Sequence, residues 1–195
     1  MGIDATDINE RMLTAGRSLL ESRGVKDGGL YNYYKERIDK GHLLSKYEIF
    51  VLEYVSDKYP KTCSILEPAA GIGTLSHALY LVGFEDVTSC EYDIRRYTAN
   101  NILREYLDTK VKVIDDTFPS PSLQDFDLVI LTNSQSSHNK FSELIDFIKT
   151  SRADVIMMPR LWEVVIDYDQ GCSLLTEAGI PFTEIGFEMI HIKRQ

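Results

Sequence analysis

The chain has 195 residues, of which 44% are hydrophobic and 26% charged, values typical of one soluble globular domain. Its formal net charge of −9 disfavours a nucleic-acid partner, because binding to phosphates requires a basic surface. No apolar run of about 18 residues is present, so no membrane partner is expected. The three cysteines are far apart, which favours reduced thiols over disulfides or a metal site. We therefore expect a cytoplasmic protein.

The first sixty residues have the pattern of helices. Ser45 and Glu48 form the pattern of a capping box, and apolar residues then recur at helical spacing until Pro60. We predict that residues 1–60 form a helical segment, either a cover on one edge of a sheet or a lid over the substrate. Residues 61–195 are then the main domain.

From Ser64 onward, short apolar runs alternate with amphipathic stretches, as in a parallel sheet with helical crossovers. Two further runs, at 182–187 and 188–194, are too close together for a crossover and must form a hairpin that turns near Gly186. The predicted fold is α/β, a doubly wound seven-stranded sheet of five parallel strands plus a C-terminal antiparallel hairpin. The five parallel strands are expected at 64–67, 87–91, 111–115, 127–133 and 153–159, and the helices between them at 74–81, 94–106, 141–149 and 173–178.

A turn with two glycines follows the first predicted strand. Glu67 ends that strand, Gly71 and Gly73 lie in the turn, and Thr74 begins a predicted helix. Glycines permit a close approach of a ligand to the backbone, and the turn lies at the carboxyl edge, where open α/β sheets bind ligands. The nicotinamide-dinucleotide pattern G-x-G-x-x-G fits poorly, because it places Ser76 at the third glycine and leaves Glu67 without a role.

The segment 65–74 resembles motif I of the class I S-adenosylmethionine-dependent methyltransferases, E/D-x-G-x-G-x-G. Glu67 matches the acid, Gly71 and Gly73 match the last two glycines, and Ala69 replaces the first. The resemblance implies a Rossmann-like fold, S-adenosyl-L-methionine as the cofactor, and a role for Glu67 in ordering the turn and the methionine end of the cofactor. Ala69 is expected to tolerate the turn if its φ is negative.

Acidic residues also follow the second and third predicted strands. Glu91 is placed to accept both ribose hydroxyls, a geometry shared by dinucleotide and adenosylmethionine sites, and Tyr92 would flank the adenine. Asp93 is predicted to cap the next helix. The resemblance implies that Asp115 or Asp116 accepts a hydrogen bond from the adenine amino group. We favour Asp115 for that role and Asp116 for capping the turn that follows.

The acceptor side is defined by the segment after the fourth predicted strand, which in this family faces the transferred methyl group. It contains Asn-Ser-Gln-Ser at 133–136 rather than a motif like N-P-P-Y, which disfavours adenine and glutamine as acceptors. Asn133 is a candidate for orienting the acceptor and contacting the cofactor. His138 and His42 are candidates for the general base that an oxygen acceptor of high pKa needs, although a lone histidine on a loop is more often simply solvated.

The predicted function is a methyltransferase that acts on a small-molecule hydroxyl or amine. The acidic composition, the missing amino-methylation motif and the single compact domain favour this hypothesis. One alternative is an RNA or protein methyltransferase, which a basic groove would indicate. Another is a non-catalytic methyltransferase-like module that binds partners.

Overall fold

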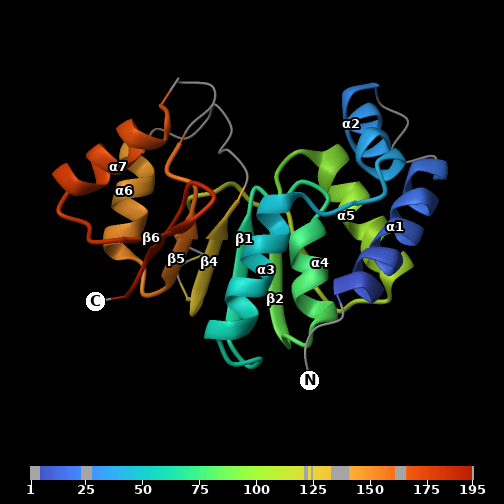
Figure 1. Cartoon of the computed structure of the whole chain (residues 1–195), viewed down its shortest axis with the longest axis horizontal. Helices are drawn as coiled ribbons and strands as arrows, with labels where there is room; N and C mark the ends of the chain where they lie inside the picture. The colour runs from blue at the N-terminus through green and yellow to red at the C-terminus, as the bar shows by residue number, and fades with distance from the viewer. Residues whose placement is uncertain are drawn as a thin grey trace.

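The computed structural model describes residues 5–22, 28–120, 123, 125–132, 141–160 and 166–194. Its centre is a seven-stranded sheet with the strand order β3-β2-β1-β4-β5-β7-β6 (Figure 1). The strands are β1 (Ser64–Pro68), β2 (Asp86–Cys90), β3 (Lys112–Ile114), β4 (Leu128–Leu131), β5 (Asp154–Met157), β6 (Thr183–Gly186) and β7 (Met189–Ile192).

The strand directions confirm the predicted sheet. Strands β1 to β5 pair in parallel, and β7 is antiparallel both to β5 and to β6. Strand β6 therefore runs parallel to the first five, so β7 alone is reversed among the seven strands described. The hairpin turns directly after Gly186, where Phe187 and Glu188 both adopt positive φ, +52° and +56°.

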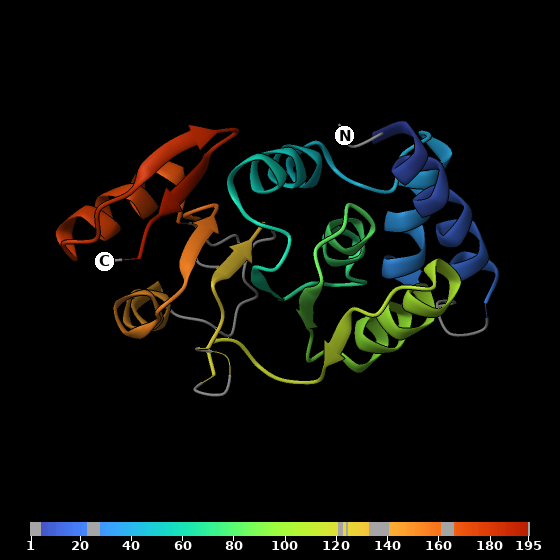
Figure 2. The same ribbon diagram turned by 90° about the horizontal axis from the view of Figure 1, so that it is seen from below.

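Helices cover both faces of the sheet (Figure 2). Ile65 and Ile130 point to the face that α3, α4 and α5 cover, and Leu66 and Val129 point to the face that α6 and α7 cover. This alternation follows from the two-residue period of a strand, and burial on both faces explains the continuous apolar runs. The helices are α1 (Ala5–Glu21), α2 (Gly28–Asp39), α3 (Lys46–Lys58), α4 (Thr74–Leu81), α5 (Ile94–Leu107), α6 (Phe141–Thr150) and α7 (Tyr168–Glu177).

Side-chain caps set where three helices begin. Ser45 and Glu48 form the predicted capping box of α3, and Asp93 caps α5 as predicted. Helix α7 begins earlier than the predicted residue 173, because Asp167 and Gln170 form a second capping box. The predicted helices 74–81, 94–106 and 141–149 agree with the structure to within one residue at each end.

The first two helices add a layer outside the sheet. Helix α1 packs on α4, α5 and α2, and Figure 1 shows it beside α5, at the end of the sheet away from β6. Met12 and Leu19 of α1 and Ile38 of α2 belong to the same buried cluster as Ile65 of β1. No helix in the described part of the chain is both long and apolar enough to cross a bilayer. The lid function considered for residues 1–60 stays a prediction.

Candidate ligand-binding site at the carboxyl edge of the sheet

The glycine turn joins the end of β1 to the start of α4. Gly71 and Gly73 have φ of +61° and +74°, a left-handed conformation that glycine adopts without steric cost. A Cβ atom on Gly73 would lie 2.6 Å from side-chain atoms of Asn100, so the turn packs directly on α5. The turn lies between β2 and β4, where the strand order reverses and open α/β sheets bind ligands.

The backbone of Ala69 differs from the expected conformation with a negative φ. Its φ is +52° rather than negative, so it occupies the left-handed region at the position where the family pattern has glycine. This conformation costs an alanine about 1–2 kcal/mol. The neighbouring backbone holds it there, because Ala70 N–H donates to Cys90 O at 3.1 Å and Gly73 N–H donates to Ala70 O at 2.9 Å.

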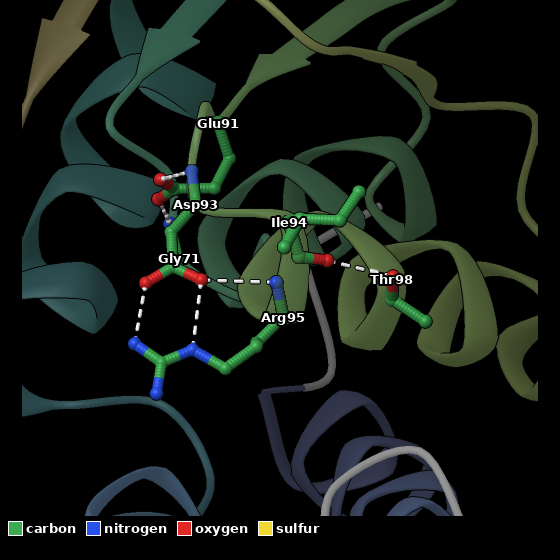
Figure 3. Close-up of polar contacts among 6 residues, drawn as sticks. All are labelled: Gly71, Glu91, Asp93, Ile94, Arg95 and Thr98. Atoms are coloured by element: carbon green, nitrogen blue, oxygen red, sulfur yellow. Dashed lines mark hydrogen bonds and ion pairs between the residues drawn. The ribbon is translucent and has the colours of Figure 1, made fainter.

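Glu91 connects the glycine turn to the end of β2 through hydrogen bonds. Its carboxylate is 1% exposed and accepts from Gly71 N–H through Oε2 and from Asp93 N–H through Oε1, both at 2.9 Å (Figure 3). A carboxylate has about four acceptor positions, so about two remain for hydroxyls of a ligand. Asp93 accepts from Arg95 N–H and pairs with its guanidinium; hydrogen bonds from Arg95 lower the pKa of Asp93 to about 2.

Glu67 has one oxygen bonded and one without a partner. Oε2 accepts from the Ser76 N–H at 2.8 Å and from the Ser76 hydroxyl, whereas Oε1 is buried and has no hydrogen-bond partner among the described residues. Burial, together with the nearby negative charges of Glu48 and Glu91, raises the pKa of Glu67 to about 8. Ser76, which argued against a dinucleotide pattern, therefore anchors the acid of the turn.

Helices α2 and α3 contact the glycine turn from outside the sheet. Glu48 of α3, 2% exposed, accepts from the hydroxyl of Thr74, the first residue of α4, and from Arg37 Nη2 at 2.7 Å. The hydroxyl of Tyr34 on α2 lies 3.2 Å from the position of a Cβ on Gly71. The sequence predicted Glu48 only as a capping residue; its charge also lies at the amino end of α4.

A buried network of polar side chains packs against the glycine turn. His77 Nδ1 lies 2.7 Å from Thr109 Oγ1, its Nε2 lies 3.0 Å from Asn100 Oδ1, and Asn100 Nδ2 donates to Ser89 Oγ at 2.6 Å. Burial lowers the pKa of His77 to about 4, so the ring is neutral near pH 7. A neutral ring has one donor and one acceptor: Nε2–H donates to Asn100, and Nδ1 accepts from Thr109.

The predicted adenine residues lie at the same edge of the sheet. Strands β2 and β3 are neighbours, and Cys90 pairs with Ile114, so Tyr92 and Asp115 follow adjacent strand ends. Both side chains are exposed. Asp116 accepts from Thr117 N–H at 2.8 Å, the geometry of a local cap. The roles of these residues toward adenine stay predictions.

The predicted catalytic residues are described only in part. Asn133 and His138 lie outside the described residues. His42 is in the loop between α2 and α3, where its backbone N–H donates to Arg37 O at 3.2 Å. Its ring atom Nδ1 is buried and has no hydrogen-bond partner among the described residues. Its role as a base stays a prediction.

Aromatic and charged residues also lie at the carboxyl ends of β5 and β6. Phe187, 51% exposed in the β6–β7 turn, packs on Phe50 and Tyr47 of α3, with ring centroids 5.1 and 6.2 Å away. Arg160, which follows β5, pairs with Glu188 at 2.8 Å. These contacts join the hairpin to α3 and to the end of β5.

Comparison with known proteins gives structural similarity without sequence similarity. No protein-family model matches the chain, and no curated protein gives a significant sequence match. The magnesium protoporphyrin IX methyltransferase of Synechocystis PCC 6803, with bound SAM, superposes with a TM-score of 0.62 and 11% identity, over 99% of this chain and 98% of that one.

Two further structures give the same result. The ribosomal protein L11 methylase of Lactobacillus delbrueckii subsp. bulgaricus has a TM-score of 0.54 and 17% identity, covering 76% of this chain and 77% of that one. A glycopeptide N-methyltransferase complexed with sinefungin has a TM-score of 0.57 and 12% identity, covering 78% and 95%. At these identities the comparisons establish the fold: a Rossmann-like α/β sheet of the class I methyltransferase type.

Proposed function

We propose that the chain is an S-adenosylmethionine-dependent methyltransferase that binds its cofactor over the glycine turn. The observation that carries this proposal is the charge around the turn. Glu48, Glu67 and Glu91 are all buried there, and Arg37 pairs with Glu48. A cofactor with a sulfonium and an ammonium group matches this surplus of carboxylates, because buried charge needs a counter-charge.

The same charges disfavour a dinucleotide. A pyrophosphate would approach the amino end of α4, where backbone N–H groups normally bind it. Glu48 already lies at that end, bonded to the Thr74 hydroxyl. The like charges of Glu48 and Glu91 would repel a phosphate placed there.

The cofactor-binding residues follow from the contacts already described. Glu91 would accept from the ribose hydroxyls with the acceptor positions that Gly71 and Asp93 leave available. Tyr92 and Asp115 would contact the adenine, and Oε1 of Glu67 would face the methionine end. The cofactor supplies a methyl carbon that is already activated, so the contribution of the protein is to position the two reactants.

We further propose that the acceptor is a small molecule with a hydroxyl or an amine. The net charge of −9 and the exposed Asp115 and Glu188 at this edge support this, because a polyanion would be repelled. The similar structures are named for porphyrin, ribosomal-protein and glycopeptide methylation, so similarity alone favours no acceptor class.

Calorimetric titration with S-adenosylmethionine and, separately, with NAD tests the cofactor proposal. We expect S-adenosylmethionine to bind and NAD not to bind. Glu91→Gln should weaken binding about 10- to 100-fold, because hydrogen bonds to a charged group contribute about 1.5–3 kcal/mol. Glu105→Gln, at an exposed position of α5, is the matched control and should bind normally. Binding of NAD instead would refute the proposal.

A product assay separates an enzyme from a binding module. Once cofactor binding is established, formation of S-adenosylhomocysteine is measured with panels of small hydroxyl and amine compounds, and with total RNA and protein extract. Turnover with a small compound supports the proposed acceptor class. Turnover only with RNA or protein would contradict that class, and cofactor binding without turnover by any acceptor would favour the non-catalytic module.

A further inference from the structure

Glu67 combines burial with an unpartnered oxygen at the ligand-binding edge. The residue is 1% exposed, and its Oε2 takes both hydrogen bonds that Ser76 donates. Oε1 is buried and unpartnered, although an ionised carboxylate oxygen ordinarily accepts one or two hydrogen bonds. Because an unpaired buried charge costs far more than an unpaired neutral polar group, this geometry favours a neutral carboxyl group until a ligand supplies a hydrogen-bond donor.

The charged groups that face Glu67 favour its neutral form. Glu48 of α3 and Glu91 after β2 add negative charge, and α4 contributes the uncharged Ser76. Arg37 is 2.7 Å from Glu48 and is engaged there. In the described part of the chain these three buried carboxylates thus share one close cation, and like charges in a buried cluster raise the energy of the last carboxyl group to ionise.

We propose that Glu67 is protonated before the cofactor binds and ionises when the methionine ammonium reaches Oε1, so that binding releases one proton to solvent. This inference rests on the proposed function. The proton leaves Oε1 for bulk water, and the ammonium becomes the counter-charge and the missing donor. The raised pKa of Glu67, about 8, agrees with a neutral carboxyl group near pH 7.

The release has a predictable size. A cation in direct contact lowers the pKa of a carboxyl group by 1–3 units. With this shift from a pKa of about 8, binding at pH 6.5 releases about 0.2 to 0.9 proton. The affinity for S-adenosylmethionine then rises about two- to eightfold per pH unit between about pH 6 and 7.5, because the free and bound states differ in protonation there.

Titration calorimetry at pH 6.5 in buffers of different ionisation enthalpy counts the protons released. S-adenosylmethionine should release about 0.2 to 0.9 proton from the unmodified chain. 5′-Methylthioadenosine keeps the nucleoside but lacks the ammonium, so it should release about none. Glu67→Gln mimics the neutral acid and keeps an acceptor for Ser76, so its binding of S-adenosylmethionine should also release about none.

The outcomes separate this inference from the proposed function. If S-adenosylmethionine binds without proton release, or if Glu67→Gln releases as many protons as the unmodified chain, the inference is wrong and the proposed function stands. If S-adenosylmethionine does not bind, both fail. The pH dependence of affinity needs no variant: a steep dependence for S-adenosylmethionine and a flat one for 5′-methylthioadenosine support the inference, and equal dependences overturn it.

Discussion

Replacing Gly73 by alanine would insert a methyl group into the polar network behind the glycine turn. The added Cβ would lie 2.6 Å from Asn100 Oδ1 and Nδ2 and 2.8 Å from its Cγ. Asn100 has no room to withdraw, because it is buried and bonded to His77 and Ser89. The backbone φ of +74° adds strain that is independent of the clash.

The expected cost is the sum of these two effects. A left-handed alanine costs about 1–2 kcal/mol. Displacing Asn100 disturbs its two buried hydrogen bonds, and the loss of each costs about 1–1.5 kcal/mol. Gly73→Ala should therefore lower the free energy of unfolding by about 3–5 kcal/mol. Gly83, with φ of +100° and no atom within 4 Å of an added Cβ, is the matched control and should show strain alone.

Urea unfolding, extrapolated linearly to water, measures both variants. We expect Gly73→Ala to lose about 2–3 kcal/mol more than Gly83→Ala, the part that comes from the network. Adding Asn100→Ala to Gly73→Ala should cost less than the sum of the single variants, because the clash is then removed. Equal losses of unfolding free energy in Gly73→Ala and Gly83→Ala would refute the claim that the polar network restrains the glycine turn.

Three further predictions concern stability. Glu67 has a pKa raised to about 8, above its unfolded value, so the stability it contributes is complete below about pH 4.5 and is lost as the pH rises through 8. The stability of Glu67→Gln relative to the unmodified chain should thus increase by about 3 kcal/mol between pH 5.5 and 7.5 in urea unfolding; a constant difference would contradict the raised pKa. Ala69→Gly should raise the melting temperature, because relief of about 1–2 kcal/mol of backbone strain exceeds the cost of the added unfolded-state entropy, about 0.4–1 kcal/mol. A lower melting temperature would contradict the strain at Ala69. Tyr59→Phe removes a hydroxyl that donates to Asp154 at 2.7 Å and lies 2.8 Å from His191 Nε2. The variant should lose about 1–2 kcal/mol of unfolding free energy in urea. An unchanged free energy of unfolding would mean that these two contacts contribute nothing to stability.

The elements that the sequence predicted are those specified locally. Apolar runs bounded by turn residues identify strands buried on both faces, and the closeness of the last two runs requires a hairpin. Gly71, Gly73 and Glu91 were identified because glycines and acids stand at fixed places relative to strand ends. In the structure Glu91 also accepts from Gly71 N–H, a contact that the pattern did not predict.

The remaining features depend on contacts between distant parts of the chain. The bond from Thr74 to Glu48 joins residues 26 positions apart, and no local pattern marks such a pair. The pairing of Glu67 with Ser76 became visible only when the first turn of α4 was placed beside the end of β1. The positive φ of Ala69 depends on backbone bonds that hold the turn, whereas residue type alone favours a negative value.

A crystal structure of the protein with S-adenosylhomocysteine tests the central claim most directly, because this product keeps both the ribose and the ammonium of the cofactor. We predict that both ribose hydroxyls lie at hydrogen-bond distance, about 2.6–3.0 Å, from the Glu91 carboxylate, with the ammonium beside Oε1 of Glu67. The nucleoside bound elsewhere, or at the glycine turn without contact to Glu91, would contradict the account.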